Sequence, residues 1–83
     1  MMRIPHELPE EFPGQMPLIK RLTRTNYEFK RLTTRYDEVN RHIYRVESED
    51  EPTTDDVLEK LKKQRLKLKD DIATMLAKLE RRM

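Results

Sequence analysis

The chain has 83 residues, of which 35% are hydrophobic and 41% are charged, so it can form one folding unit but not a large globular core. It contains no cysteine and one glycine, Gly14, which excludes disulfides, thiolate metal sites and a glycine-rich phosphate-binding loop. No apolar run approaches the roughly 18 residues of a transmembrane helix, and the first residues lack the apolar segment of a secretory signal. These features predict a small, soluble, cytoplasmic helical protein.

The first 14 residues are predicted to form a flexible, extended tail. Pro5, Pro9 and Pro13 lie within them, and proline lacks the backbone donor that helices and sheets require. Proline also restrains the residue before it, which favours extended backbone. We therefore expect the folded part of the chain to cover residues 15–83.

A first long helix is predicted over about residues 15–47. Apolar and aromatic residues recur there every three or four positions, which places them on one narrow face of a helix. The helix ends before an acidic connector, residues 48–52, in which Pro52 cannot continue it.

A second helix is predicted over about residues 53–82 and repeats the same apolar spacing. Thr53 is a suitable N-cap, and Asp55 and Asp56 would lie near the positive end of the helix dipole. The short connector requires the two helices to run antiparallel, as a coiled-coil-like hairpin in which Val46 lies opposite Leu58. The predicted seam of this all-α hairpin consists of Leu18, Leu22, Phe29, Leu32, Tyr36, Val39, Ile43, Val46, Leu58, Leu61, Leu68, Ile72, Met75 and Leu79.

One seam position of the second helix carries a charge. Arg65 would lie opposite Val39, where a single polar residue can fix the register and the oligomeric state of a coiled coil. The alternative is that Arg65 lies slightly off the seam because the helix drifts relative to the heptad repeat.

An uncharged stripe runs along one flank of the first helix, through Ile19, Asn26, Thr33 and Asn40. Near the open end of the hairpin this flank becomes apolar. Because a two-helix hairpin buries only one stripe per helix, its core alone contributes little net stability. We therefore expect self-association or partner docking through Met16, Ile19, Leu76 and Met83.

The chain resembles the YdcH-like family of small bacterial proteins. The matching segments are HELPEEFP (residues 6–13), the Phe29, Leu32 and Tyr36 step, NRHIYRVES (40–48) and LKKQRLKLKDDI (61–72). The resemblance implies a short helical hairpin or coiled coil in the bacterial cytoplasm. It implies no activity, cofactor or catalytic residue that could be assigned to positions of this chain.

No combination of residues predicts catalysis, a metal site or a cofactor. His6 lies in the proline-rich segment and His42 on a helix flank, so the sequence gives them no common site. The acidic connector lacks the ligand order and the central glycine of a calcium-binding loop. The sequence therefore predicts that the protein is not an enzyme.

Two functions remain open. The first is a protein interaction or adaptor module that binds a protein partner or a second copy of the chain. The alternative is non-specific binding of RNA or DNA, because residues 15–46 and 57–83 each carry a net charge of +5 around an acidic segment. The candidate nucleic-acid contacts are Lys60, Lys62, Lys63, Lys67 and Lys69. Membrane-surface binding is not expected, because the basic faces lack adjacent bulky apolar residues.

Overall fold

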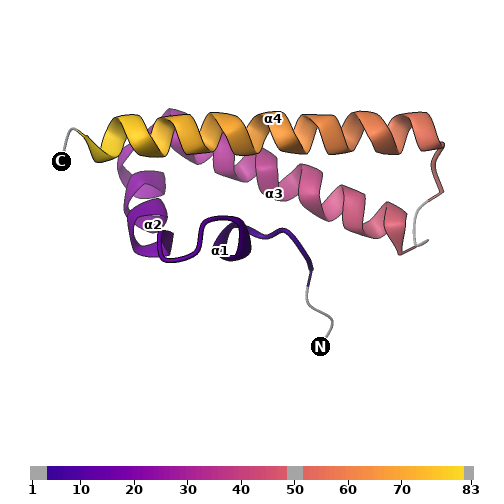
Figure 1. Cartoon of the computed structure of the whole chain (residues 1–83), viewed down its shortest axis with the longest axis horizontal. Helices are drawn as coiled ribbons and strands as arrows, with labels where there is room; N and C mark the ends of the chain where they lie inside the picture. The colour runs from indigo at the N-terminus through magenta and orange to yellow at the C-terminus, as the bar shows by residue number, and fades with distance from the viewer. Residues whose placement is uncertain (1–3, 49–51, 82–83) are drawn as a thin grey trace.

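A computed structural model describes residues 4–48 and 52–81 of the chain, and every regular element within these ranges is a helix. The prediction of an all-α protein is therefore confirmed. The described residues form four helices rather than two: α1 (Leu8–Glu11), α2 (Met16–Thr25), α3 (Tyr27–Glu47) and α4 (Asp55–Glu80). Figure 1 shows α3 and α4 paired in opposite directions, with α2 turned away from α3 at one end of the pair and α1 beside α2, on the α3 side of the pair.

The expected continuous helix over residues 15–47 is wrong, because the chain breaks at Asn26. This residue has extended backbone angles (φ −132°, ψ 114°) and is the N-cap of α3. Its Oδ1 accepts a hydrogen bond of 3.0 Å from the backbone N–H of Phe29, which has no partner within the helix. Glu28 adds a negative charge to the first turn of α3. The apolar spacing continues across Asn26 and therefore conceals the break.

The second long helix begins at Asp55 and ends at Glu80. Its N-cap is Thr54, whose hydroxyl accepts a hydrogen bond of 3.2 Å from the N–H of Val57. Thr53, the cap expected from the sequence, therefore lies one residue before the N-cap. Residues 49–51 of the predicted connector lie outside the described residues.

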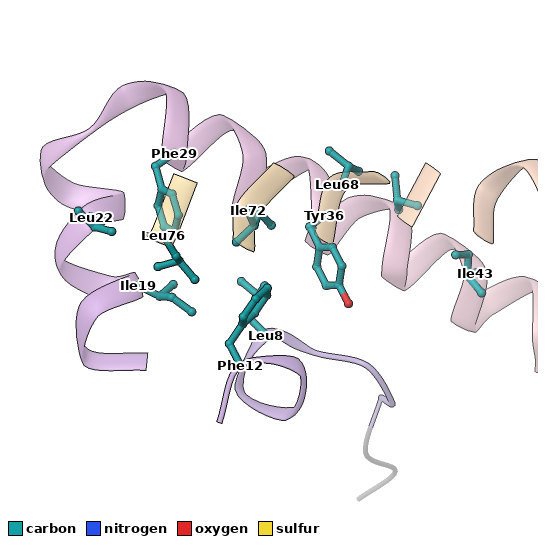
Figure 2. Packing of buried hydrophobic residues seen from close by; sticks show 11 residues of the cluster. Leu8, Phe12, Ile19, Leu22, Phe29, Tyr36, Ile43, Leu68, Ile72 and Leu76 are labelled. Atoms are coloured by element: carbon teal, nitrogen blue, oxygen red, sulfur yellow. The ribbon is translucent and has the colours of Figure 1, made fainter. Parts of the chain in front are cut away.

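The core lies where all four helices meet. Figure 2 shows Leu8 and Phe12 pointing toward the side chains of α2, α3 and α4. Phe29, Tyr36 and Ile72 are completely buried there. The cluster consists of Leu8, Phe12, Ile19, Leu22, Phe29, Tyr36, Val39, Ile43, Leu68, Ile72 and Leu76.

Residues 4–14, called the N-terminal segment below, are not the flexible tail expected from the proline content. Pro9 lies in the first turn of α1, where a missing N–H costs no hydrogen bond. Leu8 and Phe12 are one helical turn apart and are both buried. Gly14 has φ 79°, a left-handed conformation that favours glycine and allows the chain to turn into α2.

The predicted seam residues all lie in the core or against it, apart from Val46, which is buried outside the main cluster. Those only partly buried are Leu18, Leu32, Leu58, Leu61, Met75 and Leu79. The largest fully buried side chains are Ile19 on α2, Phe29, Tyr36 and Ile43 on α3, and Ile72 on α4, so full burial extends from α2 along α3. The apolar pattern therefore identified the seam residues of the long helices as core residues, but it did not place Leu8, Phe12, Ile19 or Leu76 in the core. The arrangement of the core also depends on the turn at Asn26.

Replacing Asn26 with alanine should lower stability by about 1 kcal/mol, because the N–H of Phe29 loses its cap. For a domain of this size, the expected fall in melting temperature is about 4–8 °C in a circular dichroism melt. Asn26→Ser, which retains a capping oxygen, is the matched control and should melt close to wild type. An Asn26→Ala protein that melts with the wild type would show that the cap does not stabilise the break.

Candidate functional site

Two consecutive backbone carbonyls attach the N-terminal segment to α3. The carbonyl of Pro5 accepts a hydrogen bond of 3.0 Å from Asn40 Nδ2, and the carbonyl of His6 accepts one of 2.5 Å from the Tyr36 hydroxyl. Asn40 and Tyr36 are 3% and 0% exposed and lie one turn apart on α3. Because a buried amide or hydroxyl without a partner destabilises a fold, these bonds make the segment part of the structure.

The turn that presents these carbonyls contains an unusual backbone conformation. His6 has φ 62°, which is uncommon for a residue with a side chain. Its N–H donates to Glu10 Oε2 at 3.1 Å, and its Nδ1 lies 2.7 Å from Glu11 Oε1. Both carboxylates lie in or beside α1, so α1 holds the turn at His6 in place.

Glu11 connects this turn to α4. Its Oε1 contacts His6, and its Oε2 accepts a hydrogen bond of 3.2 Å from Lys69 Nζ. Burial raises the pKa of Glu11, but the hydrogen bonds and positive charges of His6 and Lys69 outweigh this effect, so the pKa is lowered. Glu11 is therefore an ionised bridge between the N-terminal segment and α4 at neutral pH.

Arg65 faces α3 across the interface. Its Nη1 donates a hydrogen bond of 3.0 Å to Asn40 Oδ1, and the side chain is partly buried. Asn40 thus accepts from Arg65 on α4 and donates to Pro5 in the N-terminal segment. The partner of Arg65 is therefore Asn40 of the uncharged flank, and Arg65 also lines a surface hollow, so the contacts do not distinguish a seam position from one slightly off the seam. The effect of Arg65 on oligomeric state remains a prediction.

A small hollow of about 180 Å³ lies beside this network. The lining residues are His6, Glu11, Tyr36, Lys62, Arg65, Leu66 and Lys69. Burial and the charge of Glu11 raise the pKa of Tyr36 to about 12, although Arg65 opposes the shift. The Tyr36 hydroxyl therefore stays protonated at neutral pH and continues to donate to His6.

A larger groove of about 400 Å³ lies between α3 and α4. It is lined by Glu28, Arg31, Leu32, Arg35, Leu68 and Met75. Successive positions of a helix differ by about 100°, so Arg31 and Arg35 lie on a different face of α3 from Tyr36 and Asn40. The groove and the small hollow are therefore separate features.

The surface predicted for self-association is not an exposed apolar face. Ile19 and Leu76 are each only 2% exposed, and both belong to the core cluster with Leu8 and Phe12. Met16 is partly buried against this cluster, and Met83 lies outside the described residues. The uncharged flank does require a covering, but the chain's own N-terminal segment supplies it (Figure 2).

The candidate nucleic-acid contacts on α4 divide into two groups. Lys62 pairs with Glu47 at 3.3 Å, Lys67 with Asp71 at 3.8 Å and Lys69 with Glu11 at 3.2 Å. Lys60 and Lys63 are exposed and have no ion pair within the part of the chain that the structure describes. The five lysines therefore do not form one uncompensated basic surface.

Two other properties concern only the residues described. No helix among residues 4–48 and 52–81 is long and apolar enough to cross a membrane. Within the same ranges, no group of three or more His, Asp or Glu residues is placed to hold a metal ion.

Sequence reasoning missed the residues that attach the N-terminal segment. The spacing of Leu8 and Phe12 on either side of two glutamates was an available signal for a short amphipathic helix. The second signal was the uncharged stripe through Thr33 and Asn40, both of which are buried. The sequence indicates that this stripe needs a covering and predicts a second molecule there, whereas in the structure the N-terminal segment of the same chain contacts it at Asn40.

Replacing Tyr36 with phenylalanine should loosen the N-terminal segment, because the His6 carbonyl loses its donor while the aromatic ring keeps its packing. A loss of about 1 kcal/mol would make the amides of Glu11 and Phe12 exchange with solvent about fivefold faster. Tyr27→Phe is the matched control, since Tyr27 is 76% exposed. Unchanged exchange in Tyr36→Phe would contradict the proposed attachment.

Replacing Glu11 with glutamine should make stability less sensitive to acid. The pKa of Glu11 is lowered from 4.5 in the folded protein, so its stabilising effect is present above that value and is lost as the pH falls through the native pKa. Melting curves from neutral to acidic pH should therefore show a Tm difference between wild type and variant that disappears in acid. Glu38→Gln, at an exposed position of α3, provides the control. A difference that persists below the native pKa would refute this role.

The comparisons with known proteins concern mainly the two long helices. A family model described as "Protein of unknown function (DUF465)" matches residues 29–76, which is more than half of the chain. The match covers most of α3 and α4 and leaves out α1 and α2. The comparisons with curated proteins and with solved structures gave no match. The chain therefore belongs to the DUF465 family of small uncharacterised bacterial proteins, which includes the YdcH-like proteins that the sequence resembles.

Proposed function

We propose that this protein is a cytoplasmic interaction module that binds an acidic amphipathic helix of a partner protein in the groove between α3 and α4. The observation that carries the proposal is the combination of an apolar floor with two arginines that form no ion pair among the described residues. The proposal assigns the chain a binding role and no catalytic one.

The floor of the groove consists of apolar side chains that the fold leaves incompletely covered. Leu32 and Met75 are only partly buried against the core, and Leu68 is 9% exposed. A partner helix laid along two packed helices can cover such side chains with its own apolar face. The N-terminal segment does not serve this purpose, because it attaches to the face of α3 that carries Tyr36 and Asn40.

The rim of the groove determines the charge of the expected partner. Arg31 and Arg35 are exposed, lie one turn apart, and form no ion pair with any described residue. Glu28 is the single carboxylate in the lining. Guanidinium groups bind carboxylates through two parallel hydrogen bonds, so they favour glutamate or aspartate beside the apolar stripe of the partner. Charge of this kind contributes more to partner choice and association rate than to affinity.

This assignment replaces the self-association surface expected from the sequence, since Ile19 and Leu76 are buried within the chain. It is also better supported than non-specific nucleic-acid binding. Three of the five candidate lysines on α4 already pair with carboxylates of the same chain. Binding of RNA therefore serves as a competing outcome of the test.

The test uses two labelled synthetic peptides that share one leucine stripe, flanked by glutamates in the first and by lysines in the second. In fluorescence anisotropy titrations, the glutamate peptide should bind and the lysine peptide should not. The double variant Arg31→Glu, Arg35→Glu should weaken binding of the glutamate peptide by about tenfold or more, because attraction becomes repulsion at two positions. A labelled RNA duplex forms the third arm.

The control variant is Arg21→Glu, Arg24→Glu, which makes the same charge change at two exposed positions of α2 outside the groove lining. It should bind the glutamate peptide nearly as well as wild type does. Equal binding of both peptides, or an equal loss in both double variants, would overturn the proposal. Binding of RNA alone, with a steep dependence on salt, would establish the nucleic-acid alternative in its place.

A further inference from the structure

Arg65 has a positive charge that the fold does not neutralise. Its side chain is partly buried, yet its hydrogen-bond partner is the neutral amide oxygen of Asn40. No carboxylate among the described residues lies within ion-pair distance of Arg65. A partly buried guanidinium without a counter-ion among the described residues attracts an anion that can enter the hollow beside it.

We propose that the small hollow beside Arg65 binds a phosphate group, a function separate from the groove between α3 and α4. Lys62, Arg65 and Lys69 line the hollow from one face of α4, because they are spaced by three and four residues. The single carboxylate in the lining, Glu11, is already shared between His6 and Lys69. The lining therefore carries more positive than negative formal charge.

The donors around the hollow suit a tetrahedral anion. One guanidinium N–H of Arg65 is used by Asn40, which leaves further N–H groups in the planar fork of the side chain. Each ammonium group has three donors, and the pairs of Lys62 with Glu47 and of Lys69 with Glu11 use only part of them. Several oxygens of one phosphate can therefore be bound at once, mainly through charge-assisted hydrogen bonds.

The size of the hollow limits what can enter it. A volume of about 180 Å³ corresponds to several water molecules at roughly 30 Å³ each. This space admits a phosphate group with its bound water, whereas the remainder of a phosphate ester would extend into solvent. Both free phosphate and the phosphate of a larger molecule fit this description.

The site also depends on the N-terminal segment being in place. His6 and Glu11 line the hollow together with the three cations of α4, and Glu11 contacts Lys69 directly. Glu11 positions Lys69, and Asn40 positions Arg65 while it binds the carbonyl of Pro5. The docked segment thus supplies part of the lining of a hollow that stays open to solvent on its outer side.

The test is an NMR titration of the full chain with inorganic phosphate at neutral pH, with sodium chloride at the same ionic strength as reference. Phosphate should produce saturable shifts at Arg65, Lys69 and His6 that chloride does not reproduce. Lys62→Gln should weaken binding about three- to fivefold, and Arg65→Gln about tenfold or more. Parallel titrations with AMP and with phosphoserine distinguish the sources: equal affinities for all three indicate recognition of the phosphate alone, and tighter binding of one ester identifies its class.

Lys63→Gln is the matched control, because Lys63 is exposed on α4 and does not line the hollow. Its affinity for phosphate should equal that of wild type. Arg65→Gln also removes a bond to Asn40, so the decisive variant is Lys62→Gln, whose ion pair with the half-exposed Glu47 contributes little to stability. Identical shifts with chloride, no saturation with phosphate, or equal affinities in the Lys62→Gln and Lys63→Gln proteins would overturn the proposal.

Discussion

The structure depends on the requirement that buried polar groups be hydrogen-bonded. Asn40 and the Tyr36 hydroxyl are withdrawn from water on one face of α3, and each has a partner there. Those partners are two carbonyls of the N-terminal segment together with Arg65 of α4. No buried side-chain N or O atom of the described residues lacks a hydrogen bond. The polar face of α3 therefore determines where the N-terminal segment lies, and Leu8 and Phe12 add the apolar contacts.

Because the N-terminal segment docks on one side of the α3 and α4 pair, this side is covered within the chain and the side with the groove is not. One side is covered by α1 and α2, with its polar groups satisfied and a hollow lined by cations at its edge. The other side has an open groove with an apolar floor and the exposed charges of Arg31 and Arg35. The core of a two-helix hairpin alone contributes little net stability, so the contacts of α1 and α2 on one side add to the core. The other side carries the groove to which we assign the proposed partner helix.

The family match covers the α3 and α4 pair and leaves out the helices that cover one side of this pair. Residues 29–76 contain the paired helices, whereas α1, α2 and the cap at Asn26 lie outside the match. Five of the six groove residues lie within it, namely Arg31, Leu32, Arg35, Leu68 and Met75, and Glu28 lies one residue before it. The hollow combines matched residues of α3 and α4 with His6 and Glu11 from outside the matched range. The two proposed binding functions therefore differ in how much of the chain they require.

The sequence by itself determined the helical class, the seam residues of the long helices and the approximate span of α4, because a period of three to four residues is a local property. It also marked Arg65 and the uncharged stripe through Asn40 as exceptional. Only the tertiary structure decided that Asn26 breaks the first helix, that Leu8 and Phe12 enter the core, and that Ile19 and Leu76 are covered from within the chain. The break at Asn26 involves a local cap bond to Phe29. The docking of the N-terminal segment and the pairing of α3 with α4 instead join residues far apart in the sequence, such as Arg65 with Asn40, 25 positions apart, and Lys69 with Glu11, 58 positions apart. A periodic pattern shows that one face of a helix must be covered. Which segment covers it depends on contacts that form only in the folded chain, here those of Leu8 and Phe12 and of the carbonyls of Pro5 and His6.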